Sequence, residues 1–380
     1  MATVNQIYQI VNDACAEALG ESAITAKDTG TLVSLGTVVL SSADNKDAFF
    51  RALMDRIGRT VIAVREYKKK DRSVMKDDME WGLVYQKISF KPVNASTNNS
   101  WTSSAASPYD ITSQTEAVQK LFSVLSTWEY DDVIPDYQLF TAFTSAERMG
   151  AFISGIYTNM KNYMEKAEES LADLAVSTFI AGVLKSGTNA QKRDLLTEYN
   201  TLHSTSLTAE QALANRDFLK YANREILLAQ RRIRNMTTMF NAEGVARHTP
   251  EDKAVVEVLS EFATASAFYL ESDTYHKDLV ELPKYEEVNY WQAPGTTYAF
   301  EDTSSINITN AEIDADNAVE QTGIVAVIHD YDAVASIITR RRSYSKFNEA
   351  KEELIIMEKA DQGYAVDLSE NGVVFYLGEQ

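Results

Sequence analysis

The sequence has little cysteine, little proline and no long apolar run. Of its 380 residues, one is cysteine, Cys15, and six are proline. A single cysteine excludes an intrachain disulfide and any metal site built from cysteine alone, so packing must hold the fold. No apolar run reaches the ~20 residues that span a bilayer, and the N-terminus lacks the basic and apolar segments of a secretory signal. We therefore expect a soluble protein, without a membrane partner, in a reducing cytoplasm.

Basic side chains are also scarce relative to acidic ones, 36 against 55, which leaves a formal net charge of −19. This balance argues against a protein whose main task is to grip phosphate backbones. Hydrophobic residues make up 45% of the chain, which is enough to bury a core. The length corresponds to roughly two or three domains of ~100–200 residues.

Motifs that carry chemistry are missing as well. The glycine spacing of a phosphate loop occurs at Gly150–Gly155 and Gly182–Gly187, but Ile156 and Thr188 stand where lysine is required. The four histidines have no paired spacing on a helix face, and the acidic run that begins at Asp314 lacks the later ligands of a calcium loop. We therefore predict no catalytic residues, no cofactor and no metal site.

Helical periodicity is clearest at the N-terminus and in the middle of the chain. Apolar residues recur at helical spacing over Val4–Leu19, and a second helix is expected at 44–57. Between them, 23–42 is rich in small and β-branched residues and is predicted to be an extended arm. A capping box is expected at Thr144–Glu147, and the apolar stripe that follows runs to Gly187, so this helix would extend ~60 Å.

The second half of the chain changes from helices to strands. A capping box at Thr208–Gln211 predicts a helix that continues to the arginines at 231–234, and a further helix is expected from Pro250 to about Tyr269. Strands are expected at both ends of the chain, with a break at Asp131, Asp132 and Pro135: 60–64, 83–90, 121–128, 323–328, 337–338, 353–357 and 373–377. Strands before and after a helical middle favour the α+β class over a doubly wound sheet.

Three charged or polar segments lie between these elements. The run from Lys68 to Asp78 is almost entirely charged, and 94–113 is too polar to pack on its own, which is typical of a functional loop or a partner surface. The basic residues of interest are Lys68, Lys69, Lys70, Arg72, Arg340, Arg341 and Arg342. Two readings stay open for them: a solvated tip and strand edge, or contacts with acidic surfaces of neighbouring copies.

Three stretches of the sequence resemble a known family. Val133–Phe143, which leads into the long helix, is similar to the segment before the spine helix in major capsid proteins of short-tailed phages. Phe50–Val61 is similar to the passage from helix to strand before their extended loop. Ile324–Asp332, followed by Tyr344–Asn348 and Ala365–Leu377, resembles their closing strands. The order of these stretches along the chain carries the resemblance.

The resemblance implies an α+β fold of the Hong Kong 97-like capsid type. Its parts on this chain would be an N-terminal arm at 1–58, an extended loop with flanking strands at 59–143, a peripheral domain with the spine helix at 144–203, an axial domain at 204–330, and a return to the peripheral sheet at 331–380. The seven basic residues named above would then be intersubunit contacts.

The resemblance also implies a structural, non-enzymatic function. The chain would be a major capsid protein that self-assembles into the icosahedral or prolate head around the double-stranded DNA genome of a tailed phage. Its expected partners are other copies in hexamers and pentamers, a scaffolding protein, a portal, and DNA that is held without sequence-specific binding. It would reside in the virion capsid after assembly in the host bacterial cytoplasm.

Two alternatives stay open at this point. The first is the shell protein of an encapsulin-type nanocompartment, which shares the fold but encloses an enzyme. The second is an acidic cytoplasmic hydrolase, which would show a convergent cleft of titratable groups.

Overall fold

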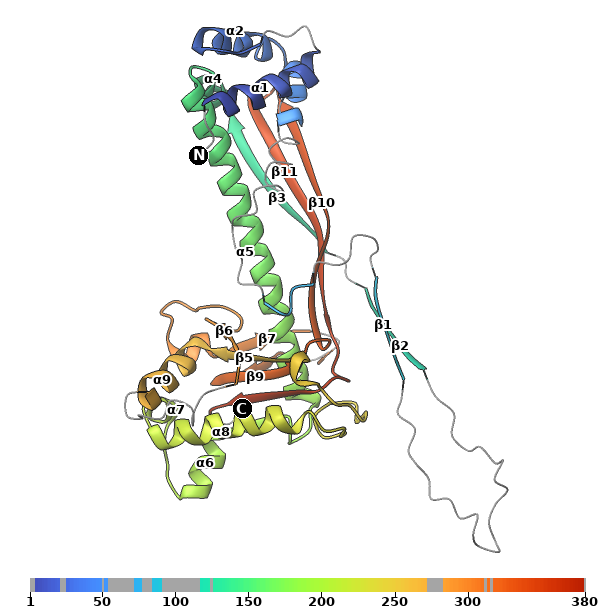
Figure 1. The fold of residues 1–380 in the computed structure, drawn as a ribbon, viewed down its shortest axis with the longest axis vertical. Coiled ribbons are helices and arrows are strands. Elements are labelled where there is room, and N and C mark those ends of the chain that lie inside the picture. The colour runs from blue at the N-terminus through green and yellow to red at the C-terminus, as the bar shows by residue number, and fades with distance from the viewer. Residues whose placement is uncertain are drawn as a thin grey trace, which may run out of the picture.

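A computed structural model describes an elongated α+β molecule in which one long helix connects two separate ends (Figure 1). Within the described part of the chain, no helix has the length and apolar character that a membrane crossing requires. The described residues are 4–20, 25–49, 51–53, 72–76, 84–90, 117–123, 126–271, 283–310, 313–314 and 317–378.

The long helix is α5 (Ala146–Ser186), whose 41 residues extend ~60 Å as expected. It begins one residue later than predicted, because Ser145 rather than Thr144 caps it and accepts a hydrogen bond from the amide of Arg148. The hydroxyl of Thr144 instead donates to the carbonyl of Thr141. The predicted capping box at Thr144–Glu147 is therefore wrong, although the helix it announced is confirmed.

A three-stranded antiparallel sheet lies along the N-terminal half of α5. Its order is β10 (Val334–Asn348), β11 (Glu353–Val366) and β3 (Ser126–Pro135). Leu354 and Ile356 of β11 are buried in the same cluster as Met149, Ile156 and Met160 of the helix. The predicted break at Asp131 and Asp132 is wrong, because β3 pairs with β11 through both residues.

Short helices cover the tip of this sheet and helix. They are α1 (Val4–Leu19), α2 (Thr29–Val39), the helical residues 43–49 and 51–53, and α4 (Asp136–Ala142). The first of them is confirmed as predicted.

The predicted extended arm at 23–42 is wrong, because α2 occupies most of it. Asp28 starts this helix by accepting a hydrogen bond from the amide of Thr31, while the hydroxyl of Thr31 binds back to the amide of Asp28. Leu32, Leu35 and Val39 are fully buried on one face. A strong cap and an apolar stripe thus outweigh the low helix propensity of the glycine and β-branched residues in this segment.

The other end of the molecule is built on a five-stranded mixed sheet with the order β4-β12-β9-β5-β6. Helices cover one face of it, and the C-terminal part of α5 covers the other: Val373 and Phe375 of β12 pack with the helices, whereas Val374 between them packs with α5. The strands are β4 (Lys192–Asp194), β5 (Ala254–Leu259), β6 (Glu286–Val288), β9 (Ile324–Asp330) and β12 (Gly372–Tyr376). The helices are α6 (Leu195–His203), α7 (Ala209–Leu213), α8 (Arg216–Arg232) and α9 (Ser260–Glu271).

Smaller elements complete this end of the molecule. They are the 3₁₀ helix η1 (Glu251–Lys253), α10 (Phe300–Thr303) and the two-stranded pair β7 (Ile306–Ile308) and β8 (Val319–Gln321).

Two predicted helices differ from the structure here. The helix expected from Thr208 through the arginines is two helices, because Asn215 accepts hydrogen bonds from the amides of Asp217 and Phe218 and starts a new one. The first half of the helix expected at 250–269 is the strand β5, whose valines are buried between β9 and β6. Valine tolerates a helical position poorly and packs well in a central strand.

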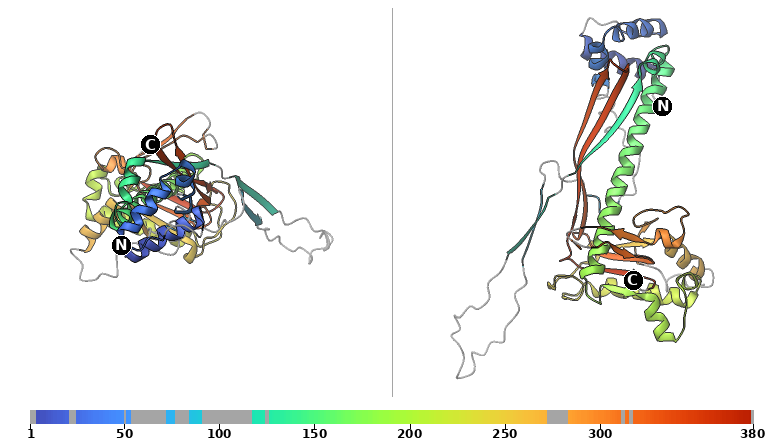
Figure 2. Two further views of the ribbon diagram at one scale, coloured as in Figure 1. Left: turned by 90° about the horizontal axis from the view of Figure 1, so that it is seen from above. Right: turned by 180° about the vertical axis from the view of Figure 1, so that it is seen from behind.

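The remaining strands, β1 (Val84–Phe90) and β2 (Ala117–Ser123), form an antiparallel hairpin that projects from the body (Figure 2). The predictions at 83–90 and for the four terminal strands are confirmed, although β10 and β11 are longer than expected. The predicted strand at 60–64 and the polar loop at 94–113 lie outside the described residues. The last predicted segment, 331–380, contributes to both sheets, because β12 pairs with β9.

Candidate functional site

The hairpin is attached to the body through a pair of lysines. Lys87 of β1 and Lys120 of β2 are directly opposite each other in the antiparallel register, so their side chains share one face of the hairpin. Like charges in this arrangement repel, and an anion placed between them relieves the repulsion. On the same face, Phe122 packs against Ala335 and Ala365 of the body.

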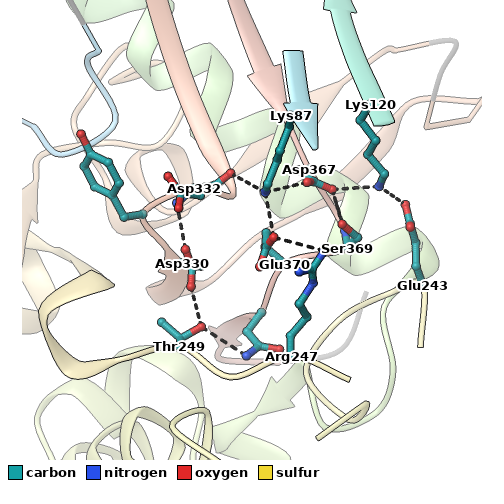
Figure 3. Close-up of polar contacts among 12 residues, drawn as sticks. Lys87, Lys120, Glu243, Arg247, Thr249, Asp330, Asp332, Asp367, Ser369 and Glu370 are labelled. Atoms are coloured by element: carbon teal, nitrogen blue, oxygen red, sulfur yellow. Dashed lines mark hydrogen bonds and ion pairs between the residues drawn. The ribbon is translucent and has the colours of Figure 1, made fainter. Parts of the chain in front are cut away.

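The anion is Asp367, in the tight turn that follows β11 (Figure 3). One carboxylate oxygen accepts from Lys87 at 2.8 Å and the other from Lys120 at 2.9 Å. The turn holds this carboxylate in place, because the amide and the hydroxyl of Ser369 both donate to it. We call Lys87, Lys120 and Asp367 the clasp.

Further charges surround the clasp from three sides. Lys87 also reaches Glu370 at 2.8 Å and donates to the backbone carbonyl of Asp332, while Lys120 pairs with Glu243. Arg247 lies 3.6 Å from Glu370.

A second group of contacts lies next to the clasp. Lys76 and Lys253 face Asp332, and the hydroxyl of Thr249 donates to Asp330 at 2.7 Å. The hairpin, the β11 turn and the loop after α8 are therefore tied together by charge.

The electrostatics of the clasp favour its charged form. Burial alone would raise the pKa of Asp367, but the charge of Lys87 and the hydrogen bonds from Lys87, Ser369 and Lys120 outweigh it and lower the pKa well below the ordinary range. Burial opposes the charged form of both lysines, yet their carboxylate partners raise the pKa of each above its usual value. Asp367 is 3% exposed, so its charge is stable only while the lysines stay in place.

The opposite face of the hairpin carries large apolar side chains that are exposed. Ile88, Phe90 and Leu121 project from it and are 58%, 62% and 61% exposed. Their neighbours across the strands are Gln119, Ala117 and Gln86. One face of the hairpin thus binds the body through charge, while the other presents large hydrophobic side chains to solvent.

Arg72 is the one residue of the first predicted basic run that lies in the described part of the chain. Its guanidinium pairs with Asp173 of α5 and with Glu257 of β5, and its side chain is 12% exposed. The reading of a solvated tip is therefore wrong for Arg72. Lys68, Lys69 and Lys70 lie outside the described residues, and a role of this run in contacts between copies stays a prediction.

The second predicted run lies on β10, at the edge of the three-stranded sheet. Arg341 pairs with Glu168 of α5, and Arg342 pairs with Asp361 of β11 at 2.6 Å. The side chain of Arg340 lies outside the described residues. Arg341 keeps 43% of its side chain exposed, so an additional contact with a neighbouring copy stays a prediction as well.

The clasp residues were not predicted from the sequence. Lys87 and Lys120 occupy the middle of two alternating strands, where a lysine usually marks a solvated face. Their shared partner Asp367 is 280 residues from Lys87 along the chain. The one local signal is the Asp-Leu-Ser-Glu-Asn sequence at 367–371, which is typical of a tight turn with two acidic groups.

Comparison with known proteins decides the family. The family model of Phi29-like phage major capsid proteins matches residues 10–376. The chain belongs to this family. The function is therefore that of a phage major capsid protein, a structural, non-enzymatic protein that forms the head shell of the virion. No curated protein matches the sequence.

Solved capsid structures support the fold of this capsid protein. A chain from the structure of the head fiber and inner core protein gp22 of bacteriophage P68 aligns with a TM-score of 0.55 at 9% identity, over 81% of this chain and 84% of that one. A chain from the capsid of Staphylococcus phage Andhra aligns with a TM-score of 0.50 at 9% identity, over 80% and 83%. The predicted Hong Kong 97-like fold is confirmed, with α5 as the long helix that the resemblance implies.

Proposed function

We propose that this capsid protein builds a closed head in which each projecting hairpin is covered by a neighbouring copy. The observation that carries the proposal is the two-faced hairpin. The clasp fixes the inner face of the hairpin to its own subunit, so the outer face points away from the body. Its outer face exposes Ile88, Phe90 and Leu121, a patch that marks an interaction surface in a soluble protein.

The energy available from this patch suits an assembly of many weak contacts. Full burial of one such side chain contributes about 1.5–3 kcal/mol, so three of them give several kcal/mol for each hairpin. In a closed shell each subunit both covers a hairpin and has its own covered. Contacts that are modest alone therefore reinforce one another once several neighbours are engaged.

We propose further that the copies form hexamers and pentamers in an icosahedral or prolate head, as the family resemblance implies. On this proposal the end with α1, α2 and the three-stranded sheet is the peripheral domain, and the end with the five-stranded sheet is the axial domain. A scaffolding protein and a portal are the further partners that the family resemblance implies. Double-stranded DNA would be enclosed without sequence-specific binding, because a subunit charged at −19 repels phosphate overall.

The test replaces the apolar patch without touching the clasp. The double variant Ile88→Asp/Leu121→Asp should give a folded subunit with wild-type circular dichroism that no longer forms shells by electron microscopy. Gln119→Asp is the matched control, because Gln119 lies opposite Ile88 on the same exposed face. Normal shells from the double variant would overturn the proposal, and loss of shells in the control as well would assign the effect to charge alone.

A further inference from the structure

A short segment of the chain, 72–76, is bound across the junction between the two ends of the subunit, and we call it the strap. Val74 is fully buried in the cluster that contains the C-terminal half of α5. The backbone of the strap bonds with β10, through the amide of Lys76 to Ser336 and the amide of Ser336 to Val74. The amide and the hydroxyl of Ser73 both donate to Glu286 of β6. The strap thus contacts α5, β10 and β6 before the chain enters the hairpin.

Arg72 anchors the strap between two buried carboxylates. One end of its guanidinium contacts Asp173 of α5, and the other lies 3.0 Å from an oxygen of Glu257 of β5. The side chain of Glu257 is 0% exposed. Its second carboxylate oxygen has no hydrogen-bond partner among the described residues. Two carboxylates, one fully buried and one largely buried, therefore share one cation.

Among the described residues, the surroundings add negative charge. Glu257 is paired in register with Glu286 of the neighbouring strand β6, and Glu169 of α5 also acts on Asp173. The phenol of Tyr290 lies in the field of the same acids, with Tyr298 near it. Burial raises the pKa of Asp173 to about 6; Arg72 opposes this rise, and Glu257 and Glu169 add to it.

We propose that the ion pairs of Arg72 with Asp173 and Glu257 hold the strap in place. When these ion pairs break and the strap opens, the subunit takes up one proton. While the strap is closed, the guanidinium balances one of the two carboxylates and lies between them. Once the strap leaves, the carboxylates remain together without a cation, and like charges in a buried place cannot both stay ionised. One of them then takes a proton from solvent. Acid therefore favours the open strap, and alkaline solution favours the closed one.

This coupling makes opening of the strap sensitive to pH between about 6 and 8, whereas the clasp keeps its charges over the same range. The clasp stays charged throughout that range, because the pKa of Asp367 is lowered and those of its lysines are raised. The hairpin would remain attached through the clasp while the strap opens. The inference goes beyond the proposed function and does not depend on it.

Hydrogen exchange on the unassembled full-length subunit tests the coupling. Exchange of the amides at 72–76 is measured at pH 6 and pH 8 and divided by the intrinsic rate at each pH. Uptake of one proton changes an opening equilibrium by up to about tenfold per pH unit. Because the pKa of Asp173 is about 6 in the closed strap, the closed state also takes up protons near pH 6, so opening should increase on the order of tenfold, less than the limit for two pH units, from pH 8 to pH 6. The variant Asp173→Asn/Glu257→Gln should show faster exchange with no pH dependence.

The control is Glu210→Gln, an exposed carboxyl on α7 that should leave the wild-type profile unchanged. A pH-independent wild-type strap would overturn the inference, and so would a wild-type slope in the double variant. If the double variant does not fold, Arg72→Gln replaces it and should exchange rapidly at both pH values. Because no step requires shells, failure of this test is distinct from failure of the proposed function.

Discussion

Removing the charge of Asp367 should loosen the hairpin and destabilise the subunit by about 2–3 kcal/mol. Asp367→Asn keeps the size of the side chain but leaves two ammonium groups facing each other. Breaking a fully buried ion pair costs about 3–5 kcal/mol, whereas an exposed pair is worth at most about 1 kcal/mol. Lys87 and Lys120 are 15% and 23% exposed and retain Glu370 and Glu243, which places the expected loss between these limits.

The measurement is urea-induced unfolding of the soluble subunit at pH 7, together with the rate at which a protease cuts the hairpin. The control is Glu243→Gln, which removes a partner that is 45% exposed and should cost under about 1 kcal/mol. Equal losses in the two variants, or unchanged cutting in Asp367→Asn, would refute the reasoning that the buried carboxylate holds the hairpin.

The same variant gives a pH profile with a defined sign. The pKa of Asp367 is lowered in the folded subunit, so its contribution is complete above the unfolded value of about 3.9 and is lost as pH falls. The pKa values of the lysines are raised, so their contribution is lost only as pH rises past about 10.4. The stability difference between wild type and Asp367→Asn should stay constant from pH 5 to 9 and shrink below pH 4.

Three further predictions concern other parts of the subunit. The raised pKa of Asp173, about 6, means that the folded state binds a proton more tightly than the unfolded chain, so this group should add stability as pH falls from 7 to 4; thermal unfolding should show this gain in wild type and lose it in Asp173→Asn. A Cβ at Gly36 would lie 2.7 Å from the ring of Phe143, so Gly36→Ala should lower stability in urea unfolding by about 1–3 kcal/mol, whereas Gly30→Ala, with 3.5 Å to Asp28, should not. Replacing Lys68, Lys69 and Lys70 with glutamate should impair assembly without unfolding the subunit; normal shells with unchanged circular dichroism would remove these lysines from the contacts between copies.

The parts of the fold that depend on local signals were predictable from the sequence. A long apolar stripe between a polar start and Gly187 predicts α5. The apolar run at 324–328 predicts the strand β9, which is fully buried. A long apolar stripe at helical spacing indicates a helix, and a short apolar run rich in β-branched residues after a glycine favours a buried strand.

The misassigned elements are those in which local and tertiary signals compete. The valines of β5 also fit a helical periodicity, and only the partners β9 and β6 decide for a strand. The glycines and β-branched residues of α2 have low helix propensity, but the Asp28 cap and the packing of Gly36 against Phe143 stabilise the helix. For β5 the deciding contacts lie far away in the sequence, whereas α2 combines a local cap with one distant packing contact.

The clasp could not be predicted from the sequence, because its residues are far apart along the chain. A lysine at 87 or 120 and an acidic turn at 367–370 are each ordinary surface features when read alone. They become a clasp only because the hairpin register aligns the lysines and the β11 turn faces them. Arg72 stands out in the sequence by its charge, but its carboxylate partners come from α5 and β5, 101 and 185 residues away.

A cryo-electron microscopy reconstruction of shells assembled from this chain tests the central claim most directly. We predict that Ile88, Phe90 and Leu121 of every hairpin are buried against a neighbouring copy, while Lys87 and Lys120 keep their contacts with Asp367 of their own subunit. A closed shell in which these three apolar side chains face solvent would contradict the account.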